Sequence, residues 1–262
     1  MGSIKAEALK IDVPGGQVQV KKWIPDINNG KPPIILLHDS LGSVDLWKKF
    51  PEMLSQAFSR SVFAYDRLGF GRSDARHSLP SNTFIEEEAS IYFPEIKKQL
   101  GLQHYVLFGH SVGGGMAIHI ASLDPDCRAV VTLSAQAFIE DLTIKGIENA
   151  KKLFKQPGQL ERLEQWHGAK ATWVLSAWTD VWLSDHFKDW SLEPAIQNVS
   201  CPVLAIHGDS DEYGSSAFPR FISERSGGTS EMLIIQNCGH MPHKEKPQDV
   251  IIAAQGFLDA IS

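Results

Sequence analysis

A serine flanked by two glycines is the strongest chemical signal in the sequence. Residues 109–113 read Gly-His-Ser-Val-Gly, directly after the apolar run 105–108 and directly before a helix-like run that starts at Gly114. This order predicts a strand, a sharp turn with Ser111 at its apex, and a helix. The helix N-terminus would direct free N–H groups and a partial positive charge toward a developing oxyanion. The pattern therefore predicts a serine nucleophile for acyl transfer.

A serine hydroxyl is a weak nucleophile, so it needs a base and an acid that orients the base. Two loops after strand-like runs carry such groups. Residues 208–213 read Gly-Asp-Ser-Asp-Glu-Tyr and contain Asp209 and Asp211, and residues 237–243 read Asn-Cys-Gly-His-Met-Pro-His and contain His240. Ligand sites in open parallel sheets lie at such loops. The chain therefore offers nucleophile, acid and histidine, in that order.

The rest of the sequence supplies the elements that position these loops. Strand-like runs cover residues 8–13, 18–23, 33–37, 61–65, 105–108, 129–133, 203–207 and 232–236. Helix-like runs cover residues 46–58, 83–100, the segment after Ser111, 217–224 and 248–260. Strands that alternate with helices predict a mainly parallel sheet covered on both faces. The turn signal at residues 14–16 predicts an N-terminal hairpin, and Pro94 predicts a kink.

One region interrupts the alternation. Residues 137–199 show only helical patterns, which predicts a helical cap inserted into a core domain formed by residues 1–136 and 200–262. The five tryptophans of this region are Trp166, Trp173, Trp178, Trp182 and Trp190. Trp178 and Trp182 are four residues apart and share a helix face. We expect these two rings to line the substrate pocket.

Taken in order, the motifs resemble those of the α/β-hydrolase superfamily over nearly the whole chain. Besides the serine turn and the two later loops, residues 38–42 read His-Asp-Ser-Leu-Gly and residues 66–73 read Asp-Arg-Leu-Gly-Phe-Gly-Arg-Ser. The resemblance implies an α/β-hydrolase fold, with a mostly parallel central sheet flanked by helices and a small helical cap. It does not imply one substrate, because this fold hosts many reactions.

The resemblance also implies roles for single residues. Ser111 would be the nucleophile, His240 the base, and Asp211 the acid, with Asp209 as the competing carboxylate. The superfamily places its acid three residues after the glycine that ends the preceding strand, and this position corresponds to Asp211. The triad would act by the general mechanism of serine hydrolases.

The resemblance implies an oxyanion hole made of two backbone N–H groups, those of Val112 and Ser40. The chain departs from the usual pattern here, because it reads His38-Asp39 where His-Gly is common, so Asp39 takes the place of the glycine. We therefore expect a somewhat different turn in this loop. Residues 39–43 also resemble the Asn-Ser-Leu-Gly-Thr loop of enol-lactone hydrolases.

Composition narrows the function classes further. The chain has 262 residues and a net charge of −6 at pH 7, with no basic stripe, which argues against nucleic-acid and membrane partners. Residues 1–10 lack the apolar core of a signal peptide. Cys127, Cys201 and Cys238 form no metal-binding spacing. These features predict a cytoplasmic protein with reduced thiols, and either a monomer or a homodimer.

Together these features predict a serine hydrolase that uses no cofactor or metal. Its small-molecule substrate would be a carboxylic ester of small-to-medium size with an apolar or aromatic group, cleaved through an acyl-enzyme. The alternatives are hydrolysis of a lactone or enol-lactone, hydrolysis of a carbon–carbon bond in a ring-cleavage product, and ligand binding without reaction. Ring-cleavage hydrolases usually carry asparagine before the serine, whereas this chain has His110, which favours the ester.

Overall fold

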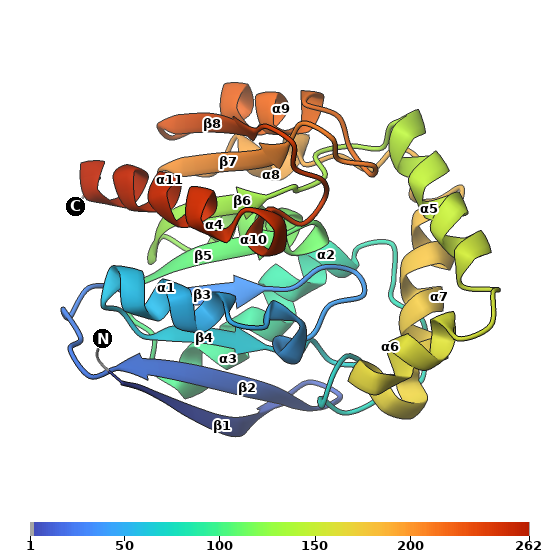
Figure 1. Cartoon of the computed structure of the whole chain (residues 1–262), viewed down its shortest axis with the longest axis horizontal. Helices are drawn as coiled ribbons and strands as arrows, with labels where there is room; N and C mark the ends of the chain where they lie inside the picture. The colour runs from blue at the N-terminus through green and yellow to red at the C-terminus, as the bar shows by residue number, and fades with distance from the viewer. Residues whose placement is uncertain (1–2, 262) are drawn as a thin grey trace.

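The computed structural model describes residues 3–261, whose strands form one sheet (Figure 1). The eight strands within these residues are β1 (Ile4–Val13), β2 (Gly16–Pro25), β3 (Ile34–Leu37), β4 (Val62–Tyr65), β5 (Tyr105–His110), β6 (Cys127–Leu133), β7 (Val203–Gly208) and β8 (Ser230–Ile235). Their order across the sheet is β1-β2-β4-β3-β5-β6-β7-β8. β2 pairs antiparallel with β1 and β4, and all other pairs are parallel. The predicted hairpin and mostly parallel sheet are confirmed.

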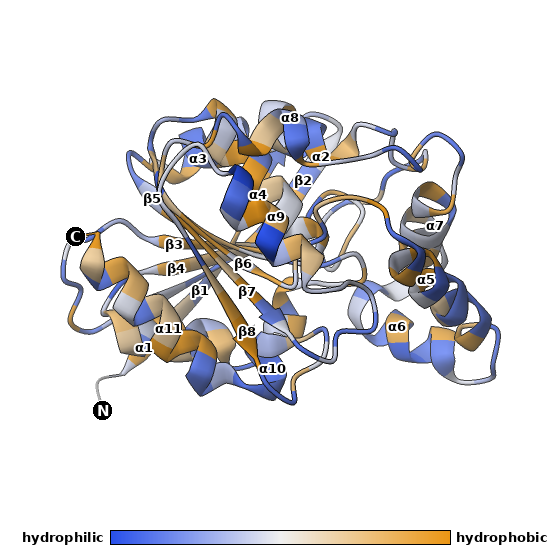
Figure 2. Cartoon of the chain, turned by 90° about the horizontal axis from the view of Figure 1, so that it is seen from above, coloured by the Kyte–Doolittle hydropathy of each residue, from blue (hydrophilic) through white to orange (hydrophobic). Residues whose placement is uncertain are grey.

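Inner strands that are buried on both faces explain the two helical layers. All four residues of β3 are buried, and successive side chains point to opposite faces. Ile35 and Leu37 share a buried cluster with α4, whereas Ile34 and Leu36 share another with α1 and α11. One face carries α1 (Phe50–Phe58) and α11 (Pro247–Ala260), and the other carries α2 (Phe84–Glu87), α3 (Phe93–Leu100), α4 (Val112–Leu123), α8 (Glu193–Ile196) and α9 (Ala217–Arg225) (Figure 2).

Two predicted helices are divided in the structure. The range 83–100 consists of α2, a π-helical turn (Glu88–Tyr92) and α3, rather than one helix with a kink at Pro94. Pro94 has no N–H to donate and its ring crowds the preceding turn, and the wider π turn accommodates both effects. Within the predicted helix 46–58, a 3-10 turn (Val44–Trp47) likewise precedes α1.

The segment between β6 and β7 places a group of helices beyond the carboxyl ends of the parallel strands (right of Figure 1). The group comprises α5 (Asp141–Leu153), α6 (Gln159–His167), a 3-10 turn (Gly168–Lys170) and α7 (Ala171–Trp182). Trp173 of α7 connects this group of helices to the core. Its ring packs 5.5 Å from that of Phe70, and its Nε1 donates to the Ser78 carbonyl at 3.1 Å. The predicted cap boundaries at residues 137 and 199 stay predictions.

Two further observations bear on the surroundings of the chain. Within residues 3–261, no helix combines the length and the apolar composition that crossing a membrane requires. Cys127, Cys201 and Cys238 carry free thiols. The sulfur atoms of Cys127 and Cys201 are 3.9 Å apart, well beyond the roughly 2.05 Å of a disulfide bond.

Candidate active site

Ser111 forms the turn between β5 and α4 with a strained backbone. Its φ of 56° and ψ of −124° are a combination that residues with a side chain rarely adopt. The turn is anchored by the Ser111 N–H, which donates to the Leu133 carbonyl at 2.9 Å. A Cβ on Gly109 would lie 2.2 Å from the Gly113 carbonyl oxygen, and a Cβ on Gly113 would lie 2.2 Å from that of Leu37. The flanking glycines therefore permit the close approach that lifts Ser111 to the apex.

The structure joins Asp211, rather than Asp209, to His240. Nδ1 of His240 lies 2.9 Å from Oδ1 and 2.8 Å from Oδ2 of Asp211, and both side chains are buried. The N–H of Tyr213 also donates to Asp211 Oδ1 at 2.8 Å, which fixes the carboxylate. Asp209 is exposed, and its Oδ1 accepts from the Cys238 N–H at 3.2 Å. Nε2 of His240 is thus the ring nitrogen available to take a proton.

The electrostatics of this pair suit acid–base chemistry. Burial would raise the pKa of Asp211, but the hydrogen bond from His240 and the charges of His240 and His207 hold it below its usual value. Burial would lower the pKa of His240, but the bond and charge of Asp211 outweigh burial and raise it. Nε2 of His207 lies 3.3 Å from Asp211 Oδ2 and 2.9 Å from the Gly214 carbonyl oxygen. The surroundings therefore stabilise an imidazolium at His240.

Gln136 is the hydrogen-bond partner of the serine hydroxyl in this structure. Oγ of Ser111 donates to Oε1 of Gln136 at 3.1 Å, so the hydroxyl is engaged by the amide rather than by His240. All three side chains line one cavity, and rotation of Ser111 about its Cα–Cβ bond would redirect the hydroxyl. Sequence reasoning misses Gln136, although its place in the loop after β6, beside the elbow, is a usable signal.

The cavity that these side chains share has a volume of about 80 Å³. Its apolar wall consists of Leu41, Ile147, Trp178, Trp182, Tyr213 and Met241. Trp178 and Trp182 are the two rings that the sequence predicts for the pocket. Tyr213, which sequence reasoning also misses, lies between α7 and His240, with its ring 4.8 Å from that of His240 and 5.7 Å from that of Trp178. This arrangement fits a small apolar group beside Ser111.

The two backbone N–H groups predicted for the oxyanion hole come from different elements. Val112 is the first residue of α4, so its N–H has no acceptor within the helix. Ser40 lines the cavity from the loop after β3. The Asp39 carbonyl holds this loop, because it accepts from the Gly42 N–H at 3.2 Å and from Nη2 of Arg67 at 2.8 Å. Asp39 is not among the residues with positive φ, so a side chain is tolerated at this position.

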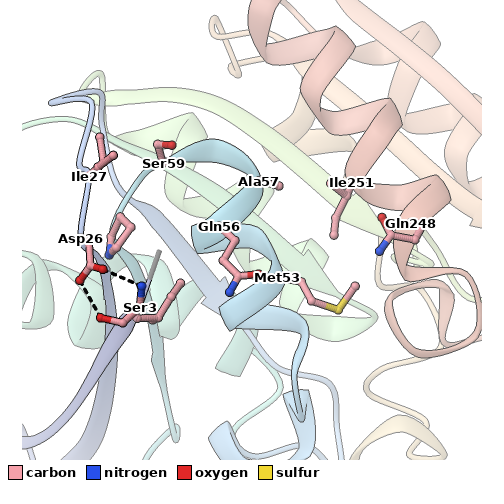
Figure 3. A pocket seen from close by; sticks show the side chains of 11 residues that line it. Ser3, Asp26, Ile27, Met53, Gln56, Ala57, Ser59, Gln248 and Ile251 are labelled. Atoms are coloured by element: carbon pink, nitrogen blue, oxygen red, sulfur yellow. Dashed lines mark hydrogen bonds between the residues drawn. The ribbon is translucent and has the colours of Figure 1, made fainter. Parts of the chain in front are cut away.

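A larger cavity lies away from these residues. It has a volume of about 410 Å³ and opens between the β1–β2 hairpin, α1 and α11 (Figure 3). Met53 and Ile251 contribute to its wall, and Ser3 beside it donates its N–H to Asp26 at 2.6 Å. No predicted site residue lines this cavity. Within residues 3–261, no cluster of His, Cys, Asp and Glu is arranged to hold a metal ion. The smaller cavity is therefore the candidate site because of the side chains that line it, and not because of its volume.

The fold and the strained elbow define the class of α/β hydrolases. A family model described as "alpha/beta hydrolase fold" matches residues 32–166, more than half of the chain. The chain belongs to this family.

More particular similarities extend over almost the whole chain. A proline iminopeptidase of Heyndrickxia coagulans is 24% identical over 304 residues, which cover 96% of this chain and 98% of that protein. A membrane phospholipase A described as a bacterial virulence factor superposes with a TM-score of 0.78 at 18% identity, covering 98% of this chain and 86% of the other. A thermophilic esterase from Thermogutta terrifontis gives 0.72 at 18% identity, with 97% and 99% covered. The two structural similarities show a shared fold.

Proposed function

We propose that this protein is a cofactor-independent serine hydrolase that cleaves carboxylic esters through an acyl-enzyme. Ser111 is the nucleophile, His240 is first the general base and then the general acid, and Asp211 holds the proton of His240 on Nδ1. The N–H groups of Val112 and Ser40 stabilise the oxyanion. The proposal depends above all on the Asp211–His240 pair, at 2.8 and 2.9 Å, beside the cavity that contains Ser111.

In this mechanism the reaction begins with a change of hydrogen-bond partner. The Ser111 hydroxyl leaves Gln136, transfers its proton to Nε2 of His240 and attacks the ester carbonyl carbon. The imidazolium, paired with Asp211, then protonates the alcohol oxygen as the C–O bond breaks, and the acyl group remains on Ser111. His240 next removes a proton from water, which attacks the acyl carbon. Return of that proton to Ser111 releases the acid.

The walls of the cavity support a short apolar substrate group. A cavity of about 150 Å³ holds benzene, so the cavity of about 80 Å³ favours an acyl or alcohol group of roughly three to five heavy atoms. Trp178, Trp182 and Tyr213 offer such a group aromatic surfaces rather than hydrogen bonds. Longer groups would require the cap helix α7 to move.

Amide hydrolysis is the second candidate, because the similarity to a proline iminopeptidase extends over almost the whole chain. An aminopeptidase binds a protonated amine, for which a carboxylate in the pocket is the natural partner. Among the described residues that line the cavity, only Asp39 carries a carboxylate. Its Oδ2 lies 3.2 Å from Nδ1 of His110. Because one oxygen of this carboxylate faces His110 and the other is buried, we favour the ester.

Hydrolysis assays with wild-type protein and Ser111→Ala test the proposal. p-Nitrophenyl acetate, butyrate and octanoate are compared with dihydrocoumarin as a lactone and with proline p-nitroanilide as an amide. We expect turnover that depends on Ser111 and is fastest for the short esters. Ser122→Ala is the matched control, because Ser122 lies on α4 and its hydroxyl bonds to the His119 carbonyl.

Three outcomes would contradict the proposal. Equal ester turnover by Ser111→Ala would exclude Ser111 as the nucleophile. Faster cleavage of the anilide or the lactone would reassign the substrate class while retaining the triad. Absence of turnover on every substrate, with ligand-induced stabilisation only, would favour a binding protein.

A further inference from the structure

A second aspartate–histidine pair lies behind His240. Oδ2 of Asp39 lies 3.2 Å from Nδ1 of His110, and the other ring nitrogen of His110, Nε2, lies 2.8 Å from the main-chain carbonyl oxygen of His240. The side chains are 2% exposed for His110 and 17% exposed for Asp39. The pair therefore connects the loop after β3, the end of β5 and the loop that carries the histidine of the proposed triad.

Both ring nitrogens of His110 face oxygen acceptors, one a carboxylate and one a carbonyl. A neutral imidazole has a proton on only one nitrogen, whereas an imidazolium donates from both. Burial would raise the pKa of Asp39, but the hydrogen bond and charge of His110 hold it far below its usual range. The geometry therefore fits a carboxylate on Asp39 and an imidazolium on His110.

The other titratable groups nearby do not replace His110 in this role. Lys244 acts on Asp39 through charge alone. His38 is neutral: its Nδ1 bonds to the Asp39 carbonyl at 2.8 Å, its Nε2 accepts a backbone N–H at 3.1 Å, and burial lowers its pKa. The ring of His243 packs 4.6 Å from that of His110, and its pKa is lowered by burial and then by the charge of His110.

We propose that Asp39 and His110 form a buried ion pair that positions the three loops of the site relative to one another. Asp39 precedes Ser40, whose N–H is the proposed oxyanion donor, and His110 precedes Ser111. The bond to the His240 carbonyl fixes the residue that carries the base, whose ring lies 5.0 Å from that of His110. The inference rests on the proposed function. Asp39 and His110 are positioning residues, since neither is assigned a contact with the reacting atoms.

The ion pair also accounts for Asp39 at a position where glycine is common. Oδ1 of Asp39 is buried without a hydrogen-bond partner, and a Cβ on Gly42 would lie only 2.3 Å from it. The carboxylate thus fills the space above Gly42 and depends on His110 for its charged hydrogen bond. Removing His110 would leave this largely buried carboxylate without its hydrogen-bonded counter-charge, which is costly.

NMR of the histidine rings tests the charge state without any substrate. Long-range ¹H–¹⁵N spectra of wild-type protein at neutral pH should show both nitrogens of His110 protonated, and spectra of His110→Gln assign the signals. In Asp39→Asn, His110 should carry a proton on one nitrogen only. A neutral His110 ring in wild-type protein would overturn the ion pair.

The rate at which a fluorophosphonate modifies Ser111 tests positioning. Asp39→Ala and His110→Ala should each slow the reaction by about 10- to 100-fold, as small displacements in active sites do. The double variant should be no slower than His110→Ala, because residues that act as one unit are not additive. Asp39→Asn keeps a hydrogen bond to a neutral His110 ring. Its labelling rate should therefore stay within about fivefold of the wild-type rate, which corresponds to the net free energy of one hydrogen bond.

His243→Phe is the matched control, since it changes another buried ring of the same cluster. It should label within about twofold of wild type, the usual range for sites outside the acting unit. Multiplicative losses in the double variant, or unchanged labelling of folded His110→Ala, would overturn the positioning role. If His110→Ala does not fold, the two Asp39 variants replace it in the test. Slow labelling of Asp39→Ala with near-wild-type labelling of Asp39→Asn would support the positioning role, and unchanged labelling of Asp39→Ala would overturn it. If wild-type protein neither reacts with the fluorophosphonate nor hydrolyses an ester, the proposed function fails, and the NMR spectra still decide the ion pair.

Discussion

Two aspartate–histidine pairs meet at His240, and they differ in what the second ring nitrogen contacts. In the Asp211–His240 pair, Nδ1 faces the carboxylate and the ring lines the cavity with Ser111. In the Asp39–His110 pair, Nδ1 also faces a carboxylate, but Nε2 is bound to a carbonyl oxygen. An aspartate–histidine pair can act as a base only where one nitrogen stays open. The same residue types, closed on both sides, form a link between loops.

The largest expected effect concerns the Asp211–His240 pair, in which Nε2 of His240 stays open. Asp211→Ala removes the carboxylate that orients His240, so kcat for ester hydrolysis should fall about 10³- to 10⁴-fold. Asp209→Ala is the control from the same loop, because its carboxylate is exposed and does not contact His240. It should cost less than about tenfold, since it lies outside the catalytic unit. Similar losses in both variants, measured at saturating ester, would break the distinction between the two carboxylates.

The pH dependence of kcat/KM gives the next effect. In the proposed mechanism His240 must be unprotonated to accept the proton of Ser111. The hydrogen bond and charge of Asp211 raise the pKa of His240 above its usual value, although burial would lower it. Activity should therefore be present above this pKa and be lost as the pH falls through it. Glu212 adds charge that raises the pKa further, so Glu212→Gln should move the acid limb to lower pH. High salt should reduce that displacement.

A wild-type acid limb with its midpoint below 6.5 would contradict the raised pKa of His240. A limb that responds to Glu212→Gln in the opposite direction would contradict the assignment of that limb to His240. Ester hydrolysis at constant ionic strength across the acid range is the measurement for both.

The smallest effect concerns the hydrogen bond from the Ser111 hydroxyl to Gln136, which directs the hydroxyl away from His240. Gln136→Leu removes the acceptor of the Ser111 hydroxyl while retaining side-chain bulk. Since a hydrogen bond contributes about 1 kcal/mol net, fluorophosphonate labelling should accelerate by up to about fivefold. Gln136→Glu keeps the acceptor and gives it a charge, which strengthens the bond to the hydroxyl, so labelling should be slower than that of wild type. A tenfold or larger decrease for the leucine variant would instead show that the amide assists the reaction.

Local sterics made the elbow predictable. Gly109 and Gly113 are needed because a Cβ at either position would meet backbone 2.2 Å away, and that requirement is visible in the sequence around Ser111. Local sequence does not distinguish Asp209 from Asp211, because both occupy one loop, so the prediction of Asp211 depended on the family pattern. In the folded loop it is Asp211 that contacts His240.

The Asp39–His110 pair gave no sequence signal, although both residues lie beside recognised motifs. They meet because Leu37 of β3 pairs with Gly109 of β5 across the sheet. Strand β4 lies between β3 and β5 along the chain and on the other side of β3 in space. Gln136 was hidden for the same reason, because its contact with Ser111 depends on β6 lying beside β5.

The sequence by itself determined the fold class, the elbow and the order of the serine, aspartate and histidine loops, because apolar periodicity and glycine sterics act over a few neighbouring residues. Only the tertiary structure decided which histidine nitrogen faces which oxygen. Sheet order brings together side chains that are distant in the chain, and burial then makes each missing hydrogen bond costly. His110 and His240 became different groups for that reason: one ring is closed between two oxygens, and the other is left open beside Ser111.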